Sequence, residues 1–164
     1  MTRKQTGGSW DPNGGPVYFL AGSEGSMTDV AEDYPYILVA VNELGGKKAP
    51  DRVEGWIDAG ARVLLDSGVF WLSNEHARRH GLTMDEALSA APEQVDGFDA
   101  LFKRYCSLID RFGDRLWGYI EIDQGGKANK VRTRGRLESL GYRPIPVYHP
   151  LVDGPEYFDE LASE

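Results

Sequence analysis

The sequence predicts an α/β fold in which parallel strands alternate with helices, and three observations support that prediction. Short apolar runs that suit buried strands recur along the chain, separated by segments with helical periodicity. The order strand, helix, strand, helix implies a parallel sheet with right-handed crossovers. Polar side chains directly follow several apolar runs, where ligands bind in such sheets. Five strands fit either the first five units of a (β/α)8 TIM-type barrel or a five-stranded doubly wound sheet.

The candidate strands are five apolar runs, at residues 17–21, 36–41, 62–66, 116–122 and 143–148. Residues 1–16 are rich in Gly, Pro and polar side chains, which predicts a flexible arm before an α/β domain over residues 17–164. After the first run comes a Gly/Ser loop at residues 22–26, which is more often a turn than a phosphate cradle. A short helical turn is predicted from Ser26 to Asp29.

Capping residues and apolar spacing predict the helices. Asp51 is expected to cap one helix, which Gly60 closes. A capping box at Thr83 and Glu86 predicts a short helix, which we expect to lie over the site as a lid-like insertion. The strongest helical pattern has apolar residues at i, i+3, i+4, i+7, i+11 and i+14 from Phe98 to Phe112.

Two further helices are predicted near the end of the printed sequence. Five basic residues lie between Lys127 and Arg136 in a segment with poor apolar periodicity. A solvated face is the default interpretation, and a phosphate-contacting surface is the alternative. Gly141 ends that helix, and the last helix opens at residues 153–155 with Pro155 in its first turn.

Composition limits the classes of protein that fit. The 164 residues are 41% hydrophobic and 11% aromatic, which indicates a globular domain or a piece of a larger protein. A net charge of -8 argues against a surface coated in positive charge, although a local basic groove would still suit nucleic acid. Cys106 is the only cysteine, which excludes an intrachain disulfide. No signal or membrane-spanning segment is recognisable, so we expect a soluble cytoplasmic protein without a membrane partner.

Two strand ends carry the candidate site. The third run ends in Asp66-Ser67-Gly68, which is either a ligand-binding strand end or a helix cap. The fourth run ends in Asp123-Gln124 followed by two glycines, and this repetition favours the ligand-binding interpretation. We therefore expect Asp66, Asp123 and His149 to meet at one face of the sheet, with Ser23 and Asn42 on its rim.

These motifs resemble the guanine transglycosylase superfamily. The resemblance lies in the Asp-Ser-Gly-x-Phe strand end at residues 66–70, in Asp123, and in the Pro-x-Pro-Val-x-His run at residues 144–149. It is closest to the phage- and island-borne relatives that insert 7-deazaguanines into DNA, commonly labelled queuine tRNA-ribosyltransferase-like. It runs from about residue 17 onward. The family motif is Asp-Ser-Gly-Gly-Phe-Gln, and this chain has Val69 for the second Gly and Trp71 for Gln.

The resemblance implies a site for a guanine-type base. A carboxylate accepts from both the N1-H and the exocyclic amine of such a ring, and an aromatic side chain stacks on it. For His149, a plain helix-end histidine is the alternative to a substrate contact. The candidate catalytic residues are Asp66 and Asp123, and the candidate substrate contacts are Ser67, Gly68, Phe70, Gln124 and His149.

The implied activity is base exchange, a pentosyl transfer that replaces guanine by a 7-deazaguanine in DNA or tRNA without a cofactor. In the family, later strands carry the covalent aspartate nucleophile and, in the tRNA enzymes, a zinc site. The printed sequence stops at Glu164, so we expect an N-terminal part, a short relative that works in a homo-oligomer or with a second subunit, or a chain without the chemistry. The alternative function is a non-catalytic α/β binding or assembly module.

A metal-dependent hydrolase is a third and weaker hypothesis. Such a barrel requires a cluster of metal ligands at a strand end. The sequence spacing of His76, His80 and His149 does not make one, so no metal site is predicted.

Overall fold

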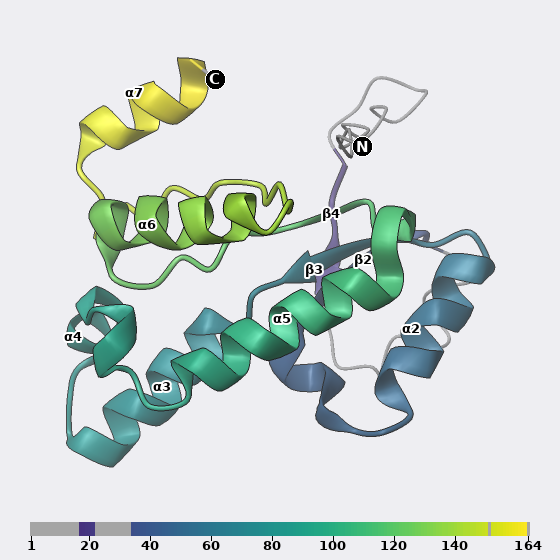
Figure 1. Ribbon diagram of the computed structural model, residues 1–164, viewed down its shortest axis with the longest axis horizontal. Helices are drawn as coiled ribbons and strands as arrows, with labels where there is room; N and C mark the ends of the chain where they lie inside the picture. Colours follow the sequence, from purple (N-terminus) through teal and green to yellow (C-terminus); the bar gives the residue numbers. More distant parts are fainter. Residues whose placement is uncertain (1–16, 22–33, 151, 164) are drawn as a thin grey trace. The chain divides into compact units, whose positions relative to one another are not determined.

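The computed structural model describes residues 17–21, 34–150 and 152–163 (Figure 1). The predicted arm, Ser23 and the helical turn at Ser26 lie outside the described residues. The chain divides into two compact units. The first contains the residues up to Asp66 together with Arg104–Tyr119, and the second contains Ser67–Lys103 and Ile120–Glu164.

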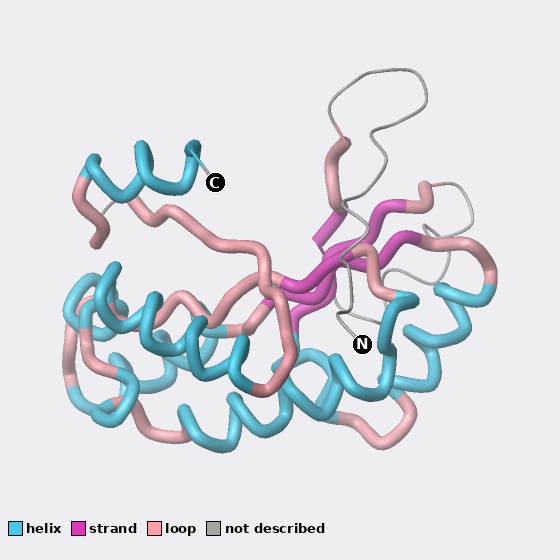
Figure 2. Tube along the Cα trace, turned by 45° about the horizontal axis from the view of Figure 1, so that its top comes forward, coloured by secondary structure: helices cyan, strands magenta, loops and turns pink. Residues whose placement is uncertain are grey.

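The first unit contains a four-stranded, all-parallel sheet, which confirms the predicted α/β class (Figure 2). Its strands are β1 (Leu20–Ala21), β2 (Tyr36–Ala40), β3 (Arg62–Asp66) and β4 (Gly118–Tyr119). They lie side by side in sequence order, β1-β2-β3-β4. A doubly wound sheet reverses its strand order at a switch point, and the described strands show no such reversal. The order therefore favours the barrel series over the doubly wound alternative.

Two helices of the first unit pack beside each other. They are α2 (Ala49–Asp58) and the part of α5 (Phe98–Phe112) from Arg104 onward. Arg111 Nη2 lies 2.9 Å from Glu54 Oε2, and Arg115 Nη2 lies 2.7 Å from Glu54 Oε1. Consecutive right-handed crossovers in one direction put their helices on one face of a sheet. That face carries Ile37, Val39, Val63 and Leu65, all with 0% exposure.

Two aromatic side chains next to the outer described strands meet at the amino ends of the sheet. Phe19 directly precedes β1, and Trp117 directly precedes β4. In a flat sheet, strands three places apart are separated by about 14 Å. The ring centroids of Phe19 and Trp117 are nevertheless only 4.7 Å apart. Such an approach is compatible with a curved sheet, which the wall of a barrel requires.

The second unit consists mainly of helices. They are α3 (Val69–His80), α4 (Met84–Ser89), the beginning of α5, α6 (Gly126–Ser139) and α7 (Pro155–Ser163). The structure confirms the capping box of α4, the extent of α5 and the start of α7 at Pro155. Helix α3 was not predicted. Its buried face includes Ser73 and His76, and these polar residues hide the apolar periodicity.

Three predicted details are wrong. Asp51 is not the cap of α2, because that helix starts at Ala49 with Lys48 as N-cap and Pro50 in its first turn. The fourth strand is only the two residues of β4. The fifth is a single parallel bridge from Ile120 to Ile145. Prolines flank Ile145 on both sides, and a proline has no N–H to donate to a ladder.

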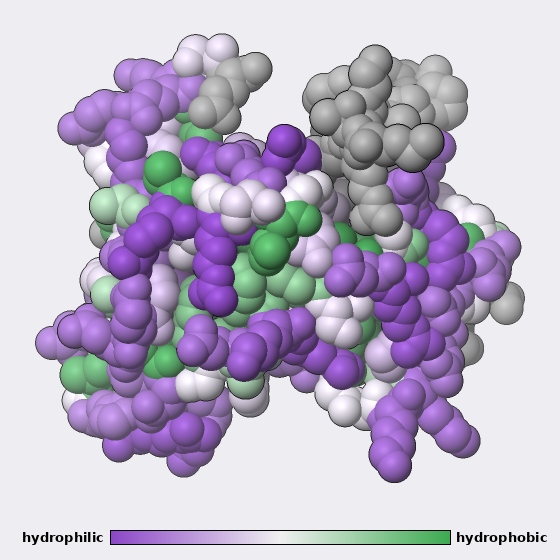
Figure 3. Space-filling view, viewed as in Figure 1, coloured by the Kyte–Doolittle hydropathy of each residue, from purple (hydrophilic) through white to green (hydrophobic). Residues whose placement is uncertain are grey.

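The visible surface is mostly hydrophilic, with smaller hydrophobic patches (Figure 3). This agrees with the 26 acidic and 18 basic residues of the chain. None of the described helices combines the length and the apolar character that crossing a membrane requires.

Candidate functional site

The loop after β3 turns the chain directly from strand into helix. Asp66 is the last residue of β3, and Gly68 is the N-cap of α3 in a left-handed conformation, φ 77°. Glycine adopts this conformation at no steric cost. The Ser67 hydroxyl accepts from the Val69 N–H at 3.4 Å and is almost fully buried. Two of the predicted site residues, Ser67 and Gly68, therefore form the turn itself.

Ser67 also contacts the segment that follows β4. Its hydroxyl donates to Asp123 Oδ1 at 3.5 Å, a long hydrogen bond, and both residues belong to the second unit. Asp123 is half-buried. Residues that follow two neighbouring parallel strands thus meet. The expected meeting was of Asp66, Asp123 and His149, and it stays a prediction. Asp66 belongs to the first unit.

Gln124 binds the end of α4. Its side chain is fully buried, and its Oε1 accepts from the Ser73 hydroxyl at 2.7 Å. Its Nε2 donates to the carbonyls of Ala87 (2.7 Å), Leu88 (3.1 Å) and Ala90 (2.9 Å). These are orphan carbonyls at a helix C-terminus. Gln124 was predicted to contact substrate. In the structure its side-chain amide instead forms hydrogen bonds with the end of α4.

Gly125 strengthens the same attachment. Its N–H donates to the Leu88 carbonyl at 2.9 Å, and a Cβ at this position would lie 2.9 Å from the Ala90 oxygen. Its φ of 84° is also one that glycine favours. The predicted lid, α4, is therefore a fixed wall beside the Asp123 loop. Helix α6 begins at Gly126, so its positive N-terminal end favours an anion at this loop.

A second carboxylate accompanies Asp66 in the first unit. Glu43 lies in η1 (Val41–Gly45), which directly follows β2. Burial raises the pKa of Glu43, a hydrogen bond with the Ala40 backbone opposes that rise, and the negative charge of Asp66 adds to it. Asn42, the predicted rim residue, is its neighbour in η1. The sequence analysis missed Glu43, although its position just after a strand was a usable signal.

The remaining predicted contacts differ in exposure. Phe70 lies on the first turn of α3 with 68% exposure, so its ring is accessible for stacking. His149 is half-buried, and its backbone N–H donates to Asp153 Oδ2 at 2.7 Å. Asp153 is buried and also accepts from Lys130. The position of His149 is thus set by a buried ion pair.

The five basic residues between Lys127 and Arg136 all form ion pairs with acidic side chains of the same chain. Lys130 is fully buried, so the solvated-face interpretation is wrong for it. The Arg136 guanidinium lies 3.9 Å from the Phe102 ring centroid. The acidic partners of the five basic residues, in chain order, are Glu160, Asp153, Glu93, Glu121 and Asp99. These contacts weaken the phosphate-binding alternative, because the positive charges already have acidic partners.

Among the described residues, one group has its donor atoms close enough to hold a metal ion. It consists of His76, His80 and Asp96, all in the second unit. The sequence spacing of the histidines had pointed against a metal cluster. The folded chain supplies a third ligand that spacing did not indicate, because Asp96 is 16 residues beyond His80.

Comparison with known proteins found no match to any family model, curated protein or solved structure. The resemblance to guanine transglycosylases therefore depends on the motif residues alone. The geometry of Ser67, Asp123 and their surroundings is the independent evidence for a function.

Proposed function

We propose that the chain binds a guanine-type base at the strand end formed by Ser67 and Asp123, as the base-binding part of a base-exchange transglycosylase. The supporting observation is the 3.5 Å contact between the Ser67 hydroxyl and Asp123 Oδ1. It brings together residues that follow two parallel strands, where α/β proteins bind their ligands. The reaction would replace guanine by a 7-deazaguanine in DNA or tRNA.

Asp123 has the chemistry that recognises this base. An ionised carboxylate offers about four acceptor sites, so a carboxylate can accept from several donors at once, as recognition of the base requires. The N1-H and the exocyclic amine of guanine are adjacent donors that match one carboxylate. A base without these donors leaves the carboxylate poorly satisfied, which is a strong basis for discrimination. Phe70 is the residue we assign to stacking on the ring.

Asp66 is assigned to catalysis with Asp123. In base exchange a carboxylate attacks C1′ of the nucleotide, and guanine leaves with the bonding electron pair and takes up a proton. The incoming 7-deazaguanine then loses its ring N–H proton as it bonds to C1′, which releases the carboxylate. Asp66 and Asp123 would hold the base and move these protons. The nucleophile itself is not assigned to a described residue.

Calorimetry tests the base-binding step. We expect 7-deazaguanine and guanine to bind more tightly than hypoxanthine, which lacks the amine, and adenine to bind weakest. Asp123→Asn should lower the affinity for guanine by about tenfold or more, since a hydrogen bond to a charged group contributes about 1.5–3 kcal/mol. Asp159→Asn on the exposed side of α7 is the matched control. Equal binding of adenine and guanine, or no binding, would refute the proposal.

A labelled-base assay separates the enzyme from the alternative, a non-catalytic binding module. The chain is incubated with DNA or tRNA and radiolabelled guanine, and incorporation into the polymer is measured. A transglycosylase incorporates label, and the incorporation falls in Asp66→Asn. A chain that binds guanine in calorimetry but incorporates none under these conditions supports the binding module.

A further inference from the structure

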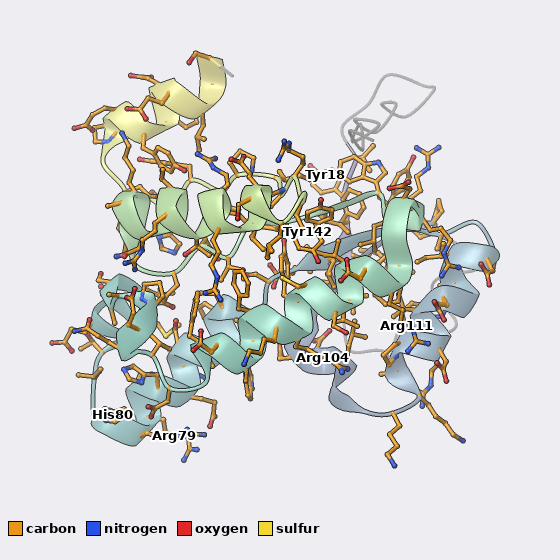
Figure 4. The ribbon with its side chains drawn as sticks, in the orientation of Figure 1. Tyr18, Arg79, His80, Arg104, Arg111 and Tyr142 are labelled. Atoms are coloured by element: carbon orange, nitrogen blue, oxygen red, sulfur yellow. The ribbon has the colours of Figure 1, made fainter. Side chains whose placement is uncertain are left out.

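A second cluster of chemically active side chains lies on α3, separate from the proposed base site. His76 and His80 are one helical turn apart, with ring centroids 4.5 Å from each other. Figure 4 shows His80 at the C-terminal end of α3. Asp96, just before α5, brings its Oδ2 to 2.9 Å from His80 Nε2 and 4.0 Å from His76 Nδ1. The three donor atoms all lie within 4.8 Å of one another.

The state of His76 suits a ligand. Its side chain is only 8% exposed, yet its Nδ1 faces Asp96. The Asp96 N–H lies 3.4 Å from this Nδ1, a long hydrogen bond that a bound metal ion would replace. A metal ion binds an imidazole nitrogen through its lone pair, in the form that carries no proton on that atom. A simple ion pair between His80 and Asp96 is the alternative interpretation. It does not explain why an imidazole nitrogen of His76 also lies near the Asp96 carboxylate.

We propose that His76, His80 and Asp96 bind a divalent transition-metal ion of the zinc type, with water completing the coordination. Bonds of about 2.0–2.1 Å put tetrahedral ligands about 3.3 Å apart. The observed separations are 2.9 and 4.0 Å for the two pairs with Asp96 and within 4.8 Å for the third pair, so the side chains must adjust to reach that geometry. Two imidazoles and one carboxylate favour zinc, cobalt or nickel over magnesium and calcium, which take oxygen ligands.

Two of the three ligands are exposed enough to adjust to an ion: the side chains of His80 and Asp96 are 48% and 51% exposed. The Asp96 side chain is 51% exposed, so its carboxylate can turn at little cost. Arg79 Nη1 lies 4.0 Å from Asp96 Oδ2, and this exposed side chain would move away from a bound cation. The bound ion would tie the end of α3 to the segment that starts α5.

Titration of the EDTA-treated chain with zinc chloride in a calorimeter tests the site. We expect saturable binding of one zinc ion per chain, with no comparable signal from magnesium. Cobalt should give visible absorption bands that zinc displaces. His80→Ala and Asp96→Asn should each weaken zinc binding by about tenfold or more, because even outer-sphere changes cost about 10–100-fold in affinity.

Asp99→Asn is the matched control, since Asp99 is a more exposed carboxylate, at 80%, near the same point of the chain. Circular dichroism monitors folding, and the half-exposed His80 and Asp96 should tolerate substitution. Unchanged zinc affinity in both site variants would assign the ion to other residues and overturn the proposal. Absence of saturable binding would also overturn it, as would an equal loss in the control.

Discussion

The Glu121 carboxylate accepts the backbone N–H of Val147 at 2.8 Å, and this side-chain bond replaces a missing rung of the sheet. The two segments that contain Glu121 and Val147 are joined by a single parallel backbone bridge, between Ile120 and Ile145. The Glu121 N–H donates to the Ile145 carbonyl at 2.9 Å. Pro144 and Pro146 have no N–H to contribute. A buried carboxylate thus supplies the pairing that the prolines cannot.

Replacing Glu121 by Gln should flatten the dependence of stability on pH. Burial raises the pKa of Glu121 above its ordinary value of 4.5, despite the opposing hydrogen bond from Val147 and the positive charges of Arg134 and Lys130. A raised pKa means that the folded state holds the proton more tightly. Its contribution to stability is therefore complete below pH 4.5 and is lost as pH rises through the folded pKa.

Urea unfolding of the wild type and Glu121→Gln from pH 4 to 8 measures this effect. The amide oxygen still accepts from Val147, so the variant should fold. Relative to the variant, the wild type should lose stability with rising pH and then level off. A difference in unfolding free energy that stays constant across the range would contradict the raised pKa.

The buried pair of Lys130 and Asp153 should show strong energetic coupling. Both side chains have 0% exposure, Lys130 Nζ also donates to the Val147 carbonyl at 2.9 Å, and Asp153 accepts from His149. Lys130→Met leaves a buried carboxylate without its cation, so we expect a loss of about 3–5 kcal/mol. The double variant with Asp153→Leu should be less destabilised than the sum of the single variants. Additive losses in chemical denaturation would show that the two groups act independently.

Gln124→Ala should destabilise the attachment of α4. It removes one acceptor and two N–H donors, so the carbonyls of Ala87, Leu88 and Ala90 each lose a hydrogen bond, although Leu88 keeps the one from Gly125. We expect a loss of about 2–4 kcal/mol in the free energy of unfolding. Ser73→Ala removes only one partner of the same amide and should cost about 1 kcal/mol. A Gln124 variant as stable as Ser73→Ala would mean that α4 is held mainly by apolar contacts.

Helices were predicted correctly where the sequence carries a complete capping box or a regular helical spacing of apolar residues. The apolar spacing from Phe98 to Phe112 gave α5 its observed limits, and Thr83 with Glu86 gave the capping box of α4. Helix α3 escaped notice because His76 and Ser73 occupy buried positions that normally hold apolar residues. Their burial depends on tertiary partners, Asp96 and Gln124, that no local pattern reveals.

The sequence predicted where the candidate site residues lie along the chain, but not which groups their side chains contact. Strand ends indicated Ser67 and Asp123, because parallel strands bring their carboxyl ends to one edge. The same reasoning suggested a ligand contact for Gln124, whose side chain instead holds α4. Burial of Lys130 inside a basic segment was equally hidden, since its acidic partner Asp153 is 23 residues away.

The Asp66→Asn substitution should lower the pKa of Glu43. Burial is the main cause of the raised Glu43 pKa, and the negative charge of Asp66 contributes in the same direction. An uncharged Asn removes that repulsion, so the Glu43 carboxyl should titrate closer to its ordinary value. NMR titration of the Glu43 side-chain carboxyl carbon in both proteins measures the shift. Asp58→Asn, on α2, is the control, and an equal shift in it would rule out a specific effect of Asp66.

Leu20→Lys should reduce self-association of the chain. Leu20 lies on β1, which pairs only with β2 among the described strands. It is in register with Ile37, yet it is 40% exposed whereas Ile37 is fully buried. Exposed apolar groups on an edge strand favour pairing with another chain, and a lysine there opposes it. We therefore expect light scattering to show a concentration-dependent increase in mass that Leu20→Lys suppresses. Leu140→Lys alters a more exposed leucine, at 59%, outside the sheet and should leave association unchanged. A wild-type chain that stays monomeric over a wide concentration range would contradict an open edge at β1.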